Sequence, residues 1–317
     1  MTRTELLAKL GRSLNKHSTL DSATETRLLD HLNNRHREIL SWPGAALLRY
    51  RTLTFASVLN QARYGLANVE GVLAIRDLAN DRTLTRSSLA SYRRSNPDPA
   101  AMTGTPHQWV PLGYQPVALF PADASELFLK STSASDTQTA YVEGWITGGY
   151  PRSASVTLTG TTAVSVSSSI TTWIGISKCY LASAAAGVVT LHEDSGSGTE
   201  LARIGIGQLQ QRYYALELDP TPSAAQTYYA DVLLAITDLA QGTDEPLMPH
   251  DFHDALYWGA MVDELIKTDD ERLMIANARW KERTNDLKLR LAQLATDTAP
   301  MTGSSRLGAW TPAGSGY

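Results

Sequence analysis

Apolar residues recur at three- and four-residue spacing near the carboxyl end of the chain, which predicts a helix there. Pro246 and Pro249 prevent an earlier helical start, so we expect this helix to begin at residues 248–250. Its apolar stripe includes two small residues, Gly259 and Ala260, which permit close approach of another element. The pattern therefore predicts a helix that other parts of the protein cover.

A second helix is predicted over residues 269–295, with a narrow apolar seam and a basic remainder. The seam consists of large residues seven positions apart, namely Leu273, Trp280, Leu287 and Leu294. One interpretation is a solvated basic face with the seam packed in the core of the same chain. The other interpretation assigns these four side chains to packing between subunits.

The amino-terminal part predicts two amphipathic helices followed by a small mixed sheet. Leucine and isoleucine residues fall on one helical face in residues 3–15 and again in residues 21–40. Short alternating runs in residues 51–120 predict strands, with a short helix at 87–94. The last of these runs, residues 117–120, is predicted to be a strand that leads into the next region.

Residues 126–212 are rich in Ser, Thr, Gly and Ala and poor in charge. Between residues 131 and 190 the charged side chains are Asp136, Glu143, Arg152 and Lys178. Alternating apolar and polar runs between turn signals predict an antiparallel β-sandwich of about seven or eight strands. Similar strand and proline-turn sequences enter and leave this region, which indicates an insertion into the preceding sheet.

The predicted fold class is α+β, with a helical and small-sheet core and an inserted antiparallel β-sandwich. The core is expected to comprise residues 1–125 and 213–297, separated by the sandwich at 126–212. Residues 298–317 contain several Pro and Gly residues, which exclude a stable helix. They are expected to form a flexible tail, which is either an idle end or an arm that orders when it docks on a partner, and docking is the role assigned here.

Composition limits the classes of function. The 317 residues are 43% hydrophobic, and 28 basic against 32 acidic residues give a net charge of -4, which argues against binding DNA by phosphate neutralisation. Cys179 is the only cysteine, so an internal disulfide is excluded and a buried thiol in a strand is expected. No stretch approaches the roughly 18 apolar residues of a membrane helix, so we expect a protein kept in a reducing cytoplasm without a membrane partner.

The sequence contains no motif typical of a nucleophile elbow, a phosphate-binding loop or a zinc protease. His250, His253 and Asp254 are candidate metal ligands at a helix start, but no third histidine or cysteine lies nearby. Helix capping and packing are the favoured roles. We therefore predict no catalytic residue, no metal and no cofactor, and we do not expect an enzyme.

Glu143 and Trp145 lie together in a predicted strand and could form a sugar-stacking platform or part of a glycosidase site. A single carboxylate does not provide the acid and base that glycoside hydrolysis needs. A strand tryptophan is also more often part of a core. Trp145, Trp173 and Tyr180 are accordingly expected in the core of the sandwich.

Several motifs in a fixed order carry a resemblance to a known family. After two amino-terminal helices they are Gly104-Thr-Pro-His-Gln-Trp-Val, Asp219-Pro-Thr-Pro, Thr243-Asp-Glu-Pro-Leu-Met-Pro-His-Asp-Phe-His-Asp-Ala-Leu and Trp258-Gly-Ala. This set resembles head-to-tail adaptor proteins of tailed bacteriophages, over about residues 1–120 and 213–297. The inserted sandwich is similar in architecture to immunoglobulin-like domains that decorate virion proteins.

The resemblance implies a structural protein of the virion neck, assembled in the host cytoplasm as a ring, expected to be a dodecamer. The ring would bind beneath the portal protein and extend the DNA channel towards a tail tube or nozzle protein. Genomic double-stranded DNA would pass without sequence-specific binding. In such adaptors the carboxyl-terminal segment docks on the portal, and here the corresponding residues are Arg306, Leu307, Trp310 and Tyr317. The alternatives are a tail-completion or nozzle component, or a carbohydrate- or host-binding module.

Overall fold

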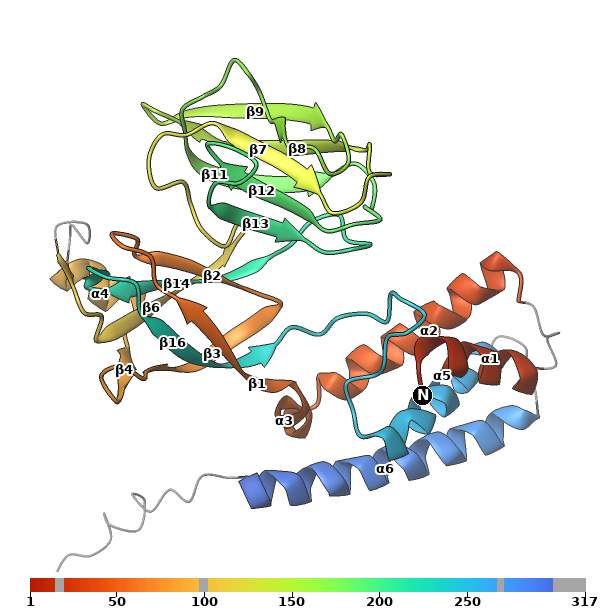
Figure 1. Ribbon diagram of the computed structural model, residues 1–317. Coiled ribbons are helices and arrows are strands. Elements are labelled where there is room, and N and C mark those ends of the chain that lie inside the picture. The colour runs from red at the N-terminus through yellow and green to blue at the C-terminus, as the bar shows by residue number, and fades with distance from the viewer. Residues whose placement is uncertain (15–19, 97–101, 267–270, 299–317) are drawn as a thin grey trace, which may run out of the picture. The chain divides into compact units, whose positions relative to one another are not determined.

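The computed structural model describes residues 1–14, 20–96, 102–266 and 271–298 (Figure 1). The chain divides into two compact units. The helical unit consists of Met1–Arg49 and Thr237–Tyr317, and the strand unit consists of Tyr50–Ile236.

The fold class is mixed α+β, as predicted. The division of the chain differs from the expected one, which placed residues 1–125 and 213–297 in one core. The helices of that core lie in one unit, and its sheet lies in the other together with residues 126–212. The reason is that the helices pack on one another in one hydrophobic cluster, whereas the sheet has a separate cluster.

The helical unit joins segments from both ends of the chain (Figure 1). Its helices are α1 (Arg3–Ser13), α2 (Ser22–Leu40), α3 (Ala46–Arg49), α5 (His253–Leu265) and α6 (Arg272–Thr298), with 3₁₀ turns η1 (Pro43–Ala45) and η3 (His250–Phe252). Thr2 caps α1 in a capping box with Glu5, and Asp21 caps α2 by accepting a hydrogen bond from the Thr24 amide. The four long helices predicted from periodicity are confirmed, with ends shifted by a few residues.

The strand unit contains a curled seven-stranded sheet with the order β1-β16-β3-β4-β6-β14-β2. These strands are β1 (Tyr50–Ala56), β2 (Arg63–Ala67), β3 (Val69–Asp77), β4 (Arg82–Arg86), β6 (Gln108–Gln115), β14 (Tyr213–Asp219) and β16 (Thr227–Leu234). All neighbours are antiparallel except β4 and β6. Phe55 on edge strand β1 packs against Tyr64 on edge strand β2, with ring centroids 5.6 Å apart, so the sheet curls until its edges meet.

The expected mixed sheet and its short helix, α4 (Leu89–Ser95), are therefore present, but the sheet is larger than predicted. Residues 117–120 do not form the predicted strand. The carbonyl of Ala118 instead accepts from the Gly65 amide, and its own amide donates to the carbonyl of Leu201. A short parallel pair, β5 (Thr103–Gly104) and β15 (Thr221–Pro222), lies apart from the main sheet.

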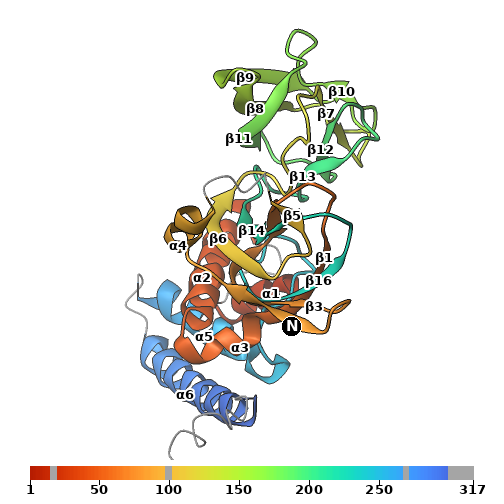
Figure 2. The ribbon, with the colours of Figure 1, turned by 90° about the vertical axis from the view of Figure 1, so that its left-hand side faces the viewer.

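Residues 127–204 form two further sheets around one hydrophobic cluster. The strands are β7 (Leu127–Ser131), β8 (Thr139–Ile146), β9 (Tyr150–Thr157), β10 (Val164–Ser165), β11 (Trp173–Leu181), β12 (Val189–Glu193) and β13 (Glu200–Ile204). They pair in the orders β10-β7-β12-β13 and β11-β8-β9, and all these pairs are antiparallel. Figures 1 and 2 show the two sheets as separate layers. Cys179 is a buried thiol in β11, as predicted, and burial raises its pKa to about 12.

Candidate functional site

Paired arginine and carboxylate side chains join helices α2 and α5. Arg27 and Arg35 lie about two turns apart on α2 and therefore on one face of it. The guanidinium of Arg27 donates to both oxygens of Glu264, at 2.8 and 3.0 Å, and Nε of Arg35 donates to Asp263 at 2.8 Å. Bidentate pairs of this kind fix orientation as well as distance. They hold α2 and α5 in one register.

Gly259 is the point at which three helices meet. A methyl group built at this glycine of α5 would lie 2.9 Å from Cγ of Arg35 on α2 and 2.9 Å from Cζ3 of Trp280 on α6. Contacts this short do not occur in real proteins, so a larger residue would separate the helices. The prediction that Gly259 permits close approach of another element is confirmed.

The apolar seam of α6 faces the core of its own unit. Trp280 is 8% exposed and Leu287 is 0% exposed, and both belong to the cluster formed with α1, α2 and α5. Leu273 and Leu294 are partly buried against the same cluster. For Trp280 and Leu287 the interpretation of packing between subunits is corrected, since other helices of the chain already cover them, because the small residues of α5 let α6 approach closely. For Leu273 and Leu294, which are partly exposed, packing between subunits stays a prediction.

The opposite side of α6 exposes large apolar side chains. Met274 is 81% exposed, Ile275 is 62% exposed and Leu289 is 64% exposed. At 3.6 residues per turn these three positions project within about 100° of one another, away from Leu287. Leu289 lies about 21 Å further along the helix than Ile275, so this side of α6 offers two separate apolar positions for contact with another molecule.

The four side chains assigned to portal docking belong to the carboxyl-terminal tail. They are Arg306, Leu307, Trp310 and Tyr317, and all of them lie outside the residues that the structure describes. Their assignment accordingly stays a prediction.

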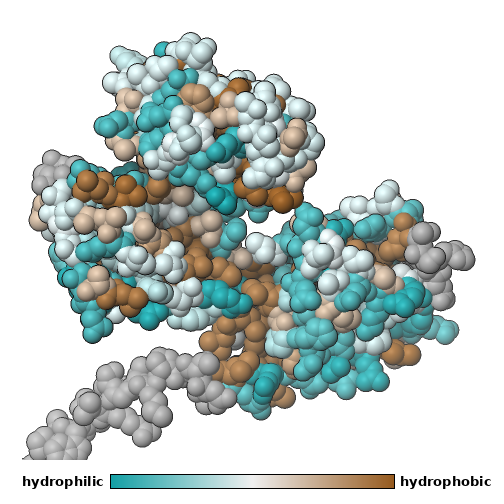
Figure 3. Space-filling view, viewed as in Figure 1, coloured by the Kyte–Doolittle hydropathy of each residue, from teal (hydrophilic) through white to brown (hydrophobic). Residues whose placement is uncertain are grey.

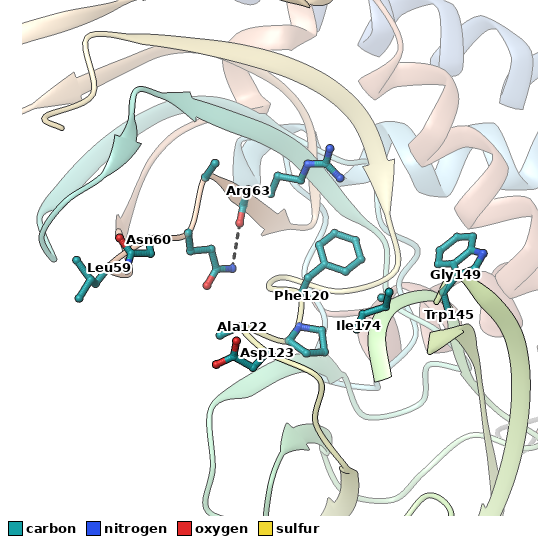
Figure 4. Close-up of a pocket in the computed structure, with 13 residues that line it drawn as sticks. Leu59, Asn60, Arg63, Phe120, Ala122, Asp123, Trp145, Gly149 and Ile174 are labelled. Atoms are coloured by element: carbon teal, nitrogen blue, oxygen red, sulfur yellow. Dashed lines mark hydrogen bonds between the residues drawn. The ribbon is translucent and has the colours of Figure 1, made fainter. Parts of the chain in front are cut away.

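The strand unit contains a hollow of about 670 Å³. It is lined by the loop that leads into β2, by the segment that leads into β7, and by residues of β8 and β11. Figure 4 shows Trp145 and Ile174 on one side of the hollow, across from Leu59 and Asn60, with Phe120 between them. The walls thus combine apolar rings and chains with polar side chains, as in many ligand sites.

Trp145 is exposed, whereas Trp173 forms part of the core. The exposed fraction is 44% for Trp145 and 0% for Trp173, so the expectation that both are core residues is wrong for Trp145 and right for Trp173. A methyl group built on Gly175 of β11 would lie 3.2 Å from Cε3 of the Trp145 indole. Tyr180 is half-buried and stacks on Tyr141, with ring centroids 4.9 Å apart. The outer face of β11-β8-β9 is therefore an aromatic surface.

A second hollow, of about 320 Å³, lies beside Trp145 and is lined by residues of β8, β9 and β11. Glu143 is part of its lining, and its carboxylate lies 2.8 Å from Nζ of Lys178. The hydrogen bond to Glu143 raises the pKa of Lys178. Glu143 is thus engaged in an ion pair, and one carboxylate paired in this way does not supply the acid and base of a glycosidase.

Sequence reasoning missed a buried carboxylate on β14. Glu217 is 2% exposed and accepts hydrogen bonds from the Tyr92 hydroxyl at 2.9 Å, from Arg93 at 3.1 Å and from Arg63 at 3.3 Å. Burial, together with the hydrogen bond to Glu217, raises the pKa of Tyr92. Because Tyr92 and Arg93 belong to α4, the carboxylate fastens this helix to the sheet.

Asp219, two residues further along β14, extends this arrangement. It is 4% exposed and accepts hydrogen bonds from the side-chain amides of Asn96, at 2.9 Å, and Gln108. Two carboxylates at alternate positions of a predicted strand are a sequence signal that could have indicated this cluster, because such residues share one face of the sheet. Their partners come from segments far away in the sequence, which no local pattern identifies.

The histidines near the start of α5 have structural contacts. His253 is buried, and its Nε2 donates to the carbonyl of Met248 at 3.1 Å, while burial lowers its pKa. The carboxylate of Asp254 accepts from Arg283 at 2.8 Å, and the ring of His250 lies 5.0 Å from that of His253. Within the described ranges, no group of three or more His, Cys, Asp or Glu residues is arranged to hold a metal ion.

Comparison of the sequence with protein-family models and with curated proteins identifies no relative. No protein-family model matches the sequence, and no curated protein matches it. Among the described helices, none combines the length and the hydropathy needed to cross a membrane.

Proposed function

We propose that the protein is a head-to-tail adaptor of a tailed bacteriophage, assembled as a dodecameric ring in the virion neck. The ring binds beneath the portal protein, extends the DNA channel and attaches the tail through a tail tube or nozzle protein. In this proposal DNA passes without sequence-specific binding, which agrees with a net charge of -4 on the chain.

The relative positions of the resemblance motifs support the proposal. The motifs at residues 104–110 and 219–222 lie side by side, because β15 pairs with β5 and the Gln108 amide donates to Asp219. The motif at residues 243–256 leads into α5, whose side chains share a hydrophobic cluster with those of α1 and α2. The quoted residues thus occupy two places in the fold, one in each unit, rather than scattered ones.

The observation that carries the proposal is the exposed apolar face of α6. Met274, Ile275 and Leu289 remain exposed although the other side of the helix is buried. Subunits of a closed ring contact one another through two different surfaces, so each subunit presents such a face to its neighbour. The ring interface therefore lies on this outer face of α6 and not on the seam at Leu287.

Residues 126–212 form an inserted immunoglobulin-like β-sandwich in this proposal. Two antiparallel sheets contribute to one hydrophobic cluster, which supports the assignment. Tyr213, the first residue of β14, also belongs to that cluster and exchanges hydrogen bonds with the backbone of Arg203. The sandwich is thus anchored to the curled sheet and is available for contacts with tail fibres or the host surface.

The test is the mass of the protein in solution, measured by light scattering alone and with portal, with electron microscopy of any large species. We expect rings that stack on portal. The double variant Met274→Glu, Leu289→Glu should remain monomeric, because two charges would be buried at each contact. The control Ala8→Glu, Ala23→Glu adds the same charge at exposed positions of α1 and α2 and should still form rings.

Removal of residues 298–317 should leave the rings intact and weaken portal binding. A wild-type chain that stays monomeric at all concentrations and ignores portal would refute the adaptor function. Rings that bind the tail tube but not portal would instead support the alternative of a tail-completion or nozzle component.

A further inference from the structure

The indole of Trp145 is an exposed aromatic surface on a rigid strand. Trp145 lies on β8, with Gly175 as its neighbour on β11 and Pro151 as its neighbour on β9. Gly175 has no side chain, and a methyl group there would lie 3.2 Å from Cε3 of the indole. The ring therefore rests against the backbone of β11, and 44% of the residue remains exposed. Both neighbours restrict its movement, so the surface is formed before any ligand arrives.

Hydrogen-bonding side chains lie on both sides of this indole. Trp145 lines the hollow of about 670 Å³ together with Asn60 and Gln61, and it also lines the hollow of about 320 Å³ together with Glu143 and Ser153. The two hollows thus meet at one aromatic ring. A ligand that spans them needs an apolar face at its centre and polar groups at its rim.

The charges near the indole are balanced. Lys178 is paired with Glu143, at 2.8 Å, and Arg63 is paired with Glu217, at 3.3 Å. The other charged residues that line the two hollows are Arg152 and Asp123, which carry opposite charges. Figure 3 colours much of the visible surface of the region that contains β7 to β13 white, with teal and brown residues among the white ones. These features favour an uncharged polar ligand.

We infer that this surface binds a neutral glycan, with a hexopyranose ring stacked on Trp145 and its hydroxyl groups bonded to the side chains around it. A hexopyranose has an apolar face of C–H groups and a rim of hydroxyls, which matches the site. A nucleobase would stack equally well, but nucleic acid sites add unpaired cations that follow the phosphates. The inference concerns the strand unit and is independent of ring formation by α6.

The test is affinity electrophoresis of the full chain in native gels that contain dextran, mannan, arabinogalactan or hydroxyethyl cellulose, with heparin as an anionic probe. At least one neutral polysaccharide should retard the wild-type protein. Trp145→Ala should weaken binding at least about tenfold, as removal of a central aromatic residue does at many binding sites. Gly175→Ala should weaken it less, because the added methyl group displaces only the indole.

Tyr150→Ala is the matched control. Tyr150 lies in the same three-stranded sheet and is 63% exposed, but it lines neither hollow, so this variant should be retarded like the wild type. Circular dichroism establishes that the variants are folded. The inference is overturned by the absence of retardation in all four neutral gels, by retardation in heparin alone, or by equal retardation of Trp145→Ala and wild type.

Discussion

The helical unit and the region of β7 to β13 each contain a buried carboxylate, and they supply its hydrogen-bond partners in different ways. Glu264 of α5 is 6% exposed and meets the guanidinium of Arg27 on α2. Asp136 is 3% exposed and meets neutral donors, namely the Ser131 hydroxyl at 2.5 Å and the Gly187 amide at 2.9 Å. A buried charge needs partners in both places. The helical unit supplies an opposite charge from another element, whereas the region of β7 to β13 supplies a hydroxyl group and a backbone amide.

This difference predicts how the two regions respond to the solvent. Ion pairs between helices depend on salt and on the protonation of nearby groups, and hydrogen bonds from neutral donors depend on them less. Burial raises the pKa of Asp136, but the hydrogen bonds from Ser131, Ala186 and Gly187 outweigh this effect and lower the pKa overall. Its contribution to stability is therefore present above the pKa of the unfolded chain and is lost only in strong acid.

The largest expected effect is the loss of core packing in the helical unit. Leu287→Ala should lower the free energy of unfolding of this unit by about 2–5 kcal/mol, because it leaves a cavity in the hydrophobic cluster of the unit. Urea titration followed by circular dichroism at 222 nm measures the change. Leu289→Ala, at the exposed face of the same helix, is the matched control and should change the free energy by less than about 0.5 kcal/mol at monomeric concentrations. Equal effects of the two variants would contradict the assignment of the buried and exposed faces.

The next effect is acid destabilisation of the helical unit through His36. Burial lowers the pKa of His36 to about 4, with Asp238 opposing the shift and His253 and Arg37 adding to it. The unfolded chain binds a proton near the ordinary pKa of about 6.5, so this contribution to stability is present above pH 6.5 and is lost as the pH falls towards 4. The loss should reach about 2 kcal/mol at pH 5.

Thermal unfolding of the helical signal between pH 7.5 and pH 5 measures this loss. His36→Gln removes the titrating group and keeps an acceptor for the amide of Leu247, which His36 Nε2 binds at 3.2 Å. The variant should therefore be less stable at pH 7.5 but show a flatter pH dependence. An unchanged slope would assign the acid sensitivity to other groups.

The smallest effect concerns salt. Glu264→Gln and Asp136→Asn should each destabilise their own region by about 1–3 kcal/mol, because both leave buried donors poorly paired. Raising NaCl from about 0.05 to 1 M shortens the screening length to about 3 Å. It should reduce the effect of Glu264→Gln by about 0.5–1 kcal/mol, since Arg27 is partly exposed, and leave that of Asp136→Asn unchanged.

Chemical unfolding of both variants at the two salt concentrations provides the comparison. Wild-type protein at each salt concentration is the reference. If salt changed the effects of Glu264→Gln and Asp136→Asn equally, the difference between a charged partner in the helical unit and neutral partners in the region of β7 to β13 would not determine the salt response.

The sequence by itself determined the local elements. Pro246 and Pro249 delay the start of α5, and the alternation of apolar residues marks most of the strands, because these signals act over a few residues through backbone sterics and side-chain direction. Gly259 also indicated, from the sequence alone, that another element packs closely against this helix. The portal-docking role of the tail remains a prediction.

Only the tertiary structure decided which of two possible faces is covered. The seven-residue spacing of α6 marked Leu287 as apolar, but the packing of α5 made that seam internal and left Met274 outside. In β8, Glu143 and Trp145 share one face, so the alternation could have shown that Trp145 points outwards. Glu217 lies opposite the core face of β14 and is buried because α4 covers it. Burial depends on segments far apart in the sequence, and a local pattern does not specify them.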